Sequence, residues 1–242
     1  MSDHRGGFWE ELGAKRFAPG RGVAEPPPQG GWRRFFFVLG THFWKLISLN
    51  LLFLAFSIPL ITIPAALCGM NRVHITLYRN GNCFVWTEFY KEFRANLWKA
   101  LPLGIFGGIG LFASYYFLSY GTSITSDGVE VLSTALGILL LAFTVLFTQY
   151  AFVFLATLNL KLGQIARNAL IFTMSEWRAN GIILTSVIVT VLVLASLFPY
   201  TLVLLFFVSF SLQQLVICAA VNTPLQKRII GPYEQSRLNK TD

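Results

Sequence analysis

The sequence predicts an all-α, polytopic helical membrane protein, with five hydrophobic segments and amphipathic helices on the cytoplasmic side. Of its 242 residues, 55% are hydrophobic and only 12% are charged, which is about half the charged share of a soluble domain. Such a chain has too little polar surface to face water on every side. Aromatic residues make up 15% of the chain, and Phe alone contributes 23 residues, which suits contact with lipid.

The N-terminal region is polar and rich in Gly and Pro. Its run AEPPPQGG at 24–31 cannot be helical, because proline lacks the backbone N–H and fixes φ. A secretory signal would place an apolar stretch in this part of the chain, so we expect no cleavable signal here. The sequence predicts a disordered tail at 1–31, a helical membrane domain at 32–221 and a basic tail at 222–242.

Five apolar segments are long enough to cross about 30 Å of hydrocarbon, which takes about 20 helical residues. They are 35–67, 101–120, 131–158, 181–198 and 201–221. Within the first segment we expect one helix over 35–58. The last two segments are separated only by Phe198, Pro199 and Tyr200, which predicts a tight helical hairpin with Pro199 at the turn.

The positions of Lys and Arg predict how these segments are oriented. Segments 68–100, 159–180 and the C-terminal tail contain twelve of the 19 basic residues, whereas 121–130 contains none. Because basic loops remain on the cytoplasmic side, we expect those three segments inside the cell and 121–130 outside.

The N-terminal region complicates this orientation. Six further basic residues precede the first apolar segment, and a single crossing by that segment would leave them outside. Either the N-terminus lies outside, or the first segment enters the membrane and turns back. The sequence is compatible with both alternatives.

The stretch SIPLITIP at 57–64 predicts where the chain would turn. Pro59 is expected to end the first helix, because a proline ring clashes with the carbonyl group four residues earlier. Pro64 suits the first turn of a new helix, where its missing N–H costs nothing. Thr62 is the candidate cap of that helix. We therefore predict a break between two helices here.

Three amphipathic helices are expected on the cytoplasmic side, over 64–79, 83–100 and 162–173. Helices with an apolar side and a basic side suit the membrane surface, and Arg72 and His74 argue against burying the first of them in lipid. Their basic side chains would bind anionic lipid headgroups or dock a partner. These side chains are Arg72, Arg79, Lys91, Arg94 and Arg167.

Neutral polar residues lie within the apolar segments. They are Asn50, Gln149, Gln213 and Gln214. We expect them either to form hydrogen bonds between helices or to line a neutral polar pocket for a sugar-like solute. Segments two to five carry no ionisable pair, which argues against proton-coupled transport. The pair Gly104 and Gly108, four residues apart, favours close helix packing.

The sequence predicts no enzyme chemistry. Its three His residues have no suitably spaced carboxylate or Cys partners for metal or acid–base work, and its three Cys residues are scattered. No Gly-rich phosphate loop followed by Lys and Ser or Thr occurs. We therefore expect no catalytic residue, no cofactor, no metal and no nucleic acid; the bilayer is the expected surrounding.

Several elements occur in an order that resembles the YesL-like bacterial membrane proteins, a family defined by a domain of unknown function. They are Asn-Leu-Leu at 50–52, Pro-x-x-Thr-x-Pro-Ala at 59–65, EFYKEFRANLWKA at 88–100 and Arg-Asn-Ala-Leu at 167–170. The resemblance extends over residues 32–221. It implies an association with carbohydrate uptake systems and no assigned biochemical activity.

From the residues and the resemblance together, we expect an accessory or regulatory membrane protein that acts with subunits of a sugar uptake system. The carbohydrate link comes from the resemblance alone. The alternative is a small permease-like solute carrier whose path uses the neutral polar residues. A membrane enzyme is disfavoured.

Overall fold

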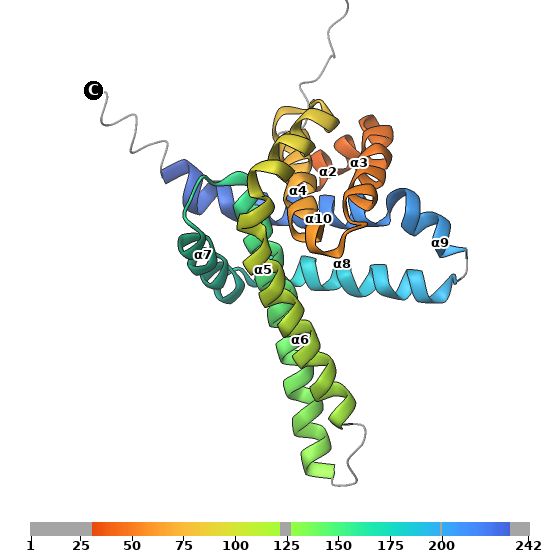
Figure 1. The fold of residues 1–242 in the computed structure, drawn as a ribbon, viewed down its shortest axis with the longest axis vertical. Helices are drawn as coiled ribbons and strands as arrows, with labels where there is room; N and C mark the ends of the chain where they lie inside the picture. Colours follow the sequence, from red (N-terminus) through yellow and green to blue (C-terminus); the bar gives the residue numbers. More distant parts are fainter. Residues whose placement is uncertain (1–30, 122–126, 199, 233–242) are drawn as a thin grey trace, which may run out of the picture.

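The computed structural model describes residues 31–121, 127–198 and 200–232. Within these ranges every regular element is helical (Figure 1). The helices long and apolar enough to cross a membrane are Leu60–Asn80, Val85–Gly121, Gly128–Thr157, Trp177–Ser196 and Leu202–Ile230. The all-α membrane fold predicted from composition is therefore confirmed. Of the predicted tail at 1–31, only Gly31 lies within the described residues.

The first apolar segment does not form the single helix expected over 35–58. Instead α2 (Gly31–Thr41) and α3 (Phe43–Phe56) meet at 81°, with His42 in a non-helical conformation between them. α3 has 14 residues and is therefore about 21 Å long, shorter than the ~30 Å of bilayer hydrocarbon. The prediction of a single helix over 35–58 is wrong, because the chain bends sharply at His42 and α3 ends at Phe56.

α3 and α4 (Ile63–Asn80) form an antiparallel pair, joined through the 3₁₀ turn η1 (Leu60–Thr62) (Figure 1). At one end of the pair, Arg34 Nε donates to the carbonyl oxygen of Tyr78 at 2.7 Å. The start of α2 therefore lies at the same end of the molecule as the end of α4. The chain thus runs away from this end along α3 and returns to it along α4.

α4 lies in the interior, and the prediction of a surface helix over 64–79 is wrong. Its apolar residues are buried in two clusters, one shared with α2 and α3 and one shared with the following helices. They are Met70, Val73, Leu77, Cys68 and Ile75. Asn71 and His74 are also fully buried. Their side chains meet polar groups from α10, which is how two polar residues are accommodated in the interior.

α5 (Val85–Gly121) unites the expected surface helix over 83–100 with the second apolar segment in one helix of 37 residues. At 1.5 Å per residue it is about 55 Å long. Pro102 lies inside it; a proline removes one helical hydrogen bond, but the helix continues through it. The prediction of a separate surface helix is corrected accordingly.

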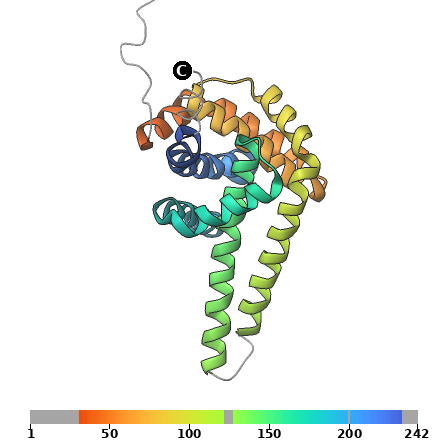
Figure 2. The same ribbon diagram turned by 90° about the vertical axis from the view of Figure 1, so that its left-hand side faces the viewer.

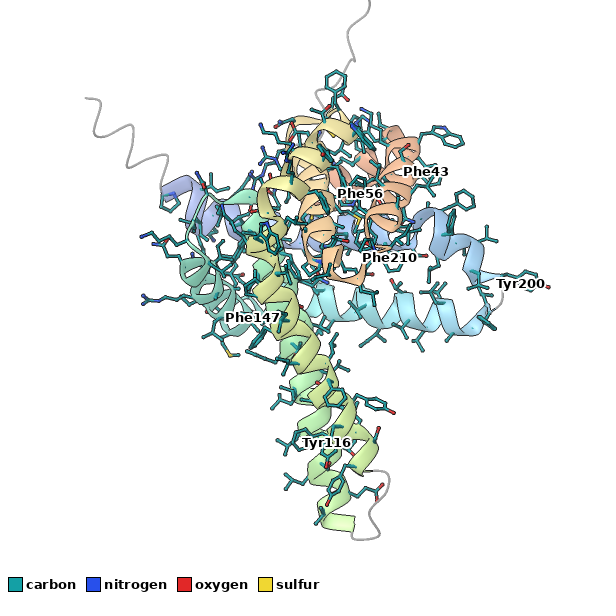
Figure 3. All side chains as sticks on the ribbon, in the orientation of Figure 1. Phe43, Phe56, Tyr116, Phe147, Tyr200 and Phe210 are labelled. Carbon is teal, nitrogen blue, oxygen red and sulfur yellow. The ribbon has the colours of Figure 1, made fainter. Side chains whose placement is uncertain are left out.

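α6 (Asp127–Thr157) packs antiparallel to α5. The two form a long hairpin that projects away from the remaining helices (Figures 1 and 2). Its free part and α8 (Trp177–Ser196) expose many large apolar side chains, and Phe112, Leu139 and Ile188 are 71, 68 and 56% exposed. Figure 3 shows side chains, among them Tyr116, projecting outward along the hairpin. Surfaces of this kind and extent suit contact with lipid.

α7 (Leu162–Ser175) precedes α8 and buries Ile165, Ala169 and Phe172 on one side. This is the side that its helical spacing predicts. Arg167 lies on the exposed side of the same helix.

The chain returns from the end of α8 as the predicted hairpin. Tyr200 is exposed at its tip (Figure 3), whereas Pro199 lies outside the described residues. The second arm of the hairpin is a continuous helix made of four consecutive elements. They are α9 (Thr201–Leu204), η2 (Leu205–Ser209), α10 (Phe210–Leu225) and η3 (Gln226–Ile230), with η2 and η3 wound as π-helix. Helical structure thus extends past residue 221, where the predicted membrane domain ends.

Candidate functional site

The break between α3 and α4 is fixed by the side chain of Thr62. α3 ends at Phe56, three residues before Pro59, and Pro64 lies in the first turn of α4, as expected. Thr62 occupies the cap position of α4 but makes no capping hydrogen bond. Its hydroxyl oxygen instead lies 2.6 Å from the carbonyl oxygens of both Phe56 and Pro59. Thr62 therefore ties the start of α4 back to the end of α3.

The glycines of α5 contact two different neighbours. A Cβ atom at Gly104 would lie closer than 3.0 Å to the ring of Pro64, and one at Gly107 would lie 2.9 Å from Thr148 on α6. Gly108 has nothing within 4 Å of the place where a Cβ would stand. The packing role predicted for the pair therefore falls to Gly104 on the side of α4, while Gly108 faces open space.

Three buried or half-buried amides from three helices form a hydrogen-bonded group, which we call the amide network: Asn71 of α4, Gln149 of α6 and Gln214 of α10. Gln214 Nε2 donates to Asn71 Oδ1 at 2.5 Å and to Gln149 Oε1 at 3.0 Å. Cys218 Sγ, one turn further along α10, lies 3.4 Å from the same Asn71 oxygen. The amide network holds α4, α6 and α10 together in the interior.

Asn50 of α3 completes the backbone of the π-helical turn η2. Its Oδ1 accepts from the backbone N–H of Ser211 at 2.9 Å, and its Nδ2 donates to the carbonyl oxygen of Phe206 at 2.6 Å. A π-helical turn widens the helix and shifts the usual backbone pairing, and an amide side chain can supply both a donor and an acceptor. The fully buried Asn50 thus satisfies groups that the distortion exposes.

Two polar atoms in this region have no hydrogen-bond partner: His74 Nδ1 and Asn71 Nδ2. The other ring nitrogen of His74, Nε2, lies 3.4 Å from Ser211 Oγ. A buried polar group without a partner costs about 1–3 kcal/mol. The interior therefore contains two polar atoms that the protein's own hydrogen bonds do not satisfy.

Gln213 lies apart from the amide network. Its Nε2 donates to Ser186 Oγ at 2.9 Å and its Oε1 accepts from Thr190 Oγ1 at 2.6 Å, and both partners belong to α8. The structure therefore brings Gln149 and Gln214 together and leaves Asn50 and Gln213 at other contacts. The four predicted amides do not line one common cavity in the part of the chain that the structure describes.

The predicted basic residues differ in how they are held. Arg72 Nε lies 3.3 Å from Glu88 Oε2 on α5, and Arg79 Nε donates to Asn222 Oδ1 on α10 at 2.8 Å. Both therefore join helices to one another. The remaining three, Lys91, Arg94 and Arg167, are exposed on α5 and α7.

A small cavity of about 230 Å³ lies between the first half of α5 and the end of α6. Arg72, Glu92, Asn96 and Lys99 line it together with residues 155–160. Among the described residues, no group of three or more His, Cys, Asp or Glu side chains is placed to hold a metal ion.

The sequence pattern did not identify the partners that make the interior polar. Asn71 and His74 are three residues apart and so share one side of a helix. This spacing is the one feature of the sequence that could have indicated a polar contact there. Ser211 and Cys218 carry no comparable signal, because small polar residues are common in apolar helices.

Residues 46–117 match a family described as "Protein of unknown function, DUF624". This stretch runs from α3 through the break and α4 into α5, and it contains Asn50, Asn71, Pro64 and Gly104. No curated protein matches the chain, and no solved structure matches it. The match supports a membrane protein that contains a domain of unknown function, and it does not indicate an activity.

Proposed function

We propose that this protein is an accessory or regulatory subunit of a membrane system for solute uptake. The observation that carries the proposal is the bridging of Asn71 and Gln149 by Gln214. A carrier needs polar groups that reach its solute along an open path, whereas these amides are joined to one another across three helices. Their arrangement favours a stable helical body over a moving solute path.

The solute class rests on resemblance. The order of motifs is similar to that of YesL-like bacterial proteins, whose association is with carbohydrate uptake. The family match over residues 46–117 coincides with the part of the chain where most of those motifs occur. We therefore propose a carbohydrate uptake system as the partner.

The docking surface in this proposal is the exposed basic part of α5 and α7. Lys91 and Arg94 project from the first turns of α5, and Trp86 and Trp98 on the same half are 59 and 78% exposed. Exposed aromatic and basic side chains together are typical of protein contacts. A partner with an acidic, partly apolar surface would fit here.

Affinity purification in a mild detergent tests this proposal. Transporter subunits should be recovered with the wild-type protein, and the triple charge reversal of Lys91, Arg94 and Arg167 to Glu should reduce that recovery. Arg33→Glu, at another exposed basic residue, on α2, serves as the control and should have no effect. Purified protein that moves sugar into liposomes without any partner would overturn the proposal.

A permease-like carrier is the second candidate, and the unpartnered His74 Nδ1 and Asn71 Nδ2 favour it. Unsatisfied polar atoms in an apolar interior could be hydrogen-bonded by a hydroxylated solute. In that case liposomes containing the purified protein would take up sugar, and Gln149→Leu combined with Gln214→Leu would abolish the flux. Absence of flux in the wild-type liposomes would exclude this candidate.

A further inference from the structure

A cavity of about 480 Å³ lies at one end of the α8–α10 pair, where α2 covers it. Its walls come from the start of α2, the start of α8 and the run from α10 into η3. The apolar part of the lining includes Trp32, Phe35, Ile182, Val216, Ala219 and Ala220. This cavity shares no residue with the amide network or with the exposed basic residues of α5 and α7.

The rim of this cavity is strongly basic. Arg178, Lys227 and Arg228 line it, against the single carboxylate of Glu176. That carboxylate is already engaged, because its Oε1 lies 2.6 Å from Arg228 Nε. Within the described residues no ion pair engages Arg178 or Lys227, and both are exposed. Two positive charges therefore remain at the rim of an apolar cavity.

The surrounding helices place this cavity at the level of lipid headgroups. α8 and the helix Leu202–Ile230 are both long and apolar enough to span a membrane, and the cavity lies where the first begins and the second ends. Trp177 and Trp32 beside it are 76 and 55% exposed. Exposed Trp side chains at helix ends are typical of the membrane–water interface.

We propose that this cavity binds one anionic phospholipid. The phosphate group would lie between Arg178 and Lys227, and the acyl chain would pass over Ile182 and Val216 toward the exposed apolar side of α8. Basic pockets between membrane helices recognise such headgroups, and each charged hydrogen bond to a phosphate oxygen is short and strong. A free phosphate ion would leave the apolar lining without an occupant, which is why the cavity fits a lipid better.

Retention of lipid by the purified full-length protein tests this inference. After exchange into mixed micelles of phosphatidylglycerol and phosphatidylcholine, native mass spectrometry should detect one retained phosphatidylglycerol. Arg178→Gln combined with Lys227→Gln should reduce the preference for phosphatidylglycerol roughly 25-fold, since each basic residue near a headgroup contributes a factor of about five. The matched control, Lys99→Gln with Lys161→Gln, removes the same charge from two other exposed positions and should leave the preference unchanged.

A second variant fills the cavity without changing its charge. Thr223 is exposed at the cavity wall, so Thr223→Trp should fold with an unchanged melting temperature and lose the retained lipid. Equal retention of the two lipids by the wild type, or equal loss in the two charge variants, would overturn the proposal. So would full competition by millimolar glycerol phosphate, which would indicate a site for the free anion.

The acidic and aromatic stretch Phe8–Leu12 (FWEEL) of the N-terminal region has a chemistry that could compete for the same cavity. A disulfide that forms between Trp9→Cys and Thr223→Cys in membranes containing phosphatidylglycerol would show that this segment is the occupant. That result would overturn the lipid assignment. Absence of the cross-link together with retained lipid is the expected result.

Discussion

The ring of Pro64, in the first turn of α4, occupies the space that a side chain at position 104 of α5 would need. Pro64 therefore has two roles: it suits the first turn of a helix, and it sets how closely α5 approaches. Because the ring is rigid, it cannot rotate aside as a flexible side chain could. The break in the first apolar segment is thus part of the contact between α4 and α5.

Gly104→Ala should destabilise the protein. Overpacking costs about 1–3 kcal/mol, whereas alanine in a helix returns up to about 1 kcal/mol relative to glycine, so the net effect should be a lower melting temperature in detergent. Gly108→Ala has free space and should leave the melting temperature equal or higher. Equal shifts in the two variants would contradict the packing described here.

Thr62→Val should loosen the tie between α3 and α4. The substitution keeps the branched shape and removes the hydroxyl that lies between the carbonyl oxygens of Phe56 and Pro59. A loss of about 1 kcal/mol in unfolding free energy is expected, and limited proteolysis should cut faster near residues 57–62. Thr62→Ser retains the hydroxyl and should have the stability and proteolysis rate of the wild type. If the serine variant is as unstable as the valine variant, the hydroxyl does not tie α3 to α4.

Asn50→Leu should expose the backbone of η2 to exchange. Removing the amide leaves the N–H of Ser211 and the carbonyl oxygen of Phe206 without the partner described above, at a cost of about 1–3 kcal/mol. Hydrogen exchange should accelerate in residues 205–211 and remain unchanged in α7. Gln213→Leu, which affects contacts to α8, is the matched control and should not accelerate exchange at Ser211.

The elements that local chemistry determines could be predicted from the sequence. The break at 57–64 follows from proline, and the α8–α10 hairpin follows from two apolar runs with a short uncharged turn between them. The spacing of Ile165, Ala169 and Phe172 also identifies the buried side of α7. In each case the deciding residues lie within a few turns of one another.

The position of α4 could not be predicted in this way. Asn71 and His74 look unsuited to an apolar interior, and Gln214, the hydrogen-bond partner of Asn71, is 143 residues away from it. The continuity of α5 through Pro102 is a similar case, because packing against α4 and α6 supports a helix that the local rule would interrupt. The role of Asn50 depends on a π-helical turn in a distant segment, which no local pattern indicates.

Cys83 should be the most reactive of the three cysteines. Cys68 and Cys218 are fully buried, whereas Cys83 is half-buried in the link between α4 and α5. Burial raises the pKa of the Cys83 thiol, and nearby Lys45 opposes this by lowering it. Because only the thiolate reacts, alkylation at pH 7 should be slower than for a free cysteine and should still be accelerating with pH above about 8.5. Lys45→Ala removes the charge that lowers the pKa of Cys83, so alkylation of this variant should be slower than that of the wild type at pH 7.

The same cysteine reports the side of the membrane on which the basic end lies. If the positive charges near α4 and α5 remain in the cytoplasm, a membrane-impermeant maleimide should label Cys83 in inside-out vesicles and not in intact cells. Tyr200→Cys in a Cys83→Ser background, at the exposed tip of the α8–α10 hairpin, should give the opposite pattern. Labelling of both positions from one side would mean that this hairpin does not cross the membrane, because its tip and the α4–α5 link would then share a compartment.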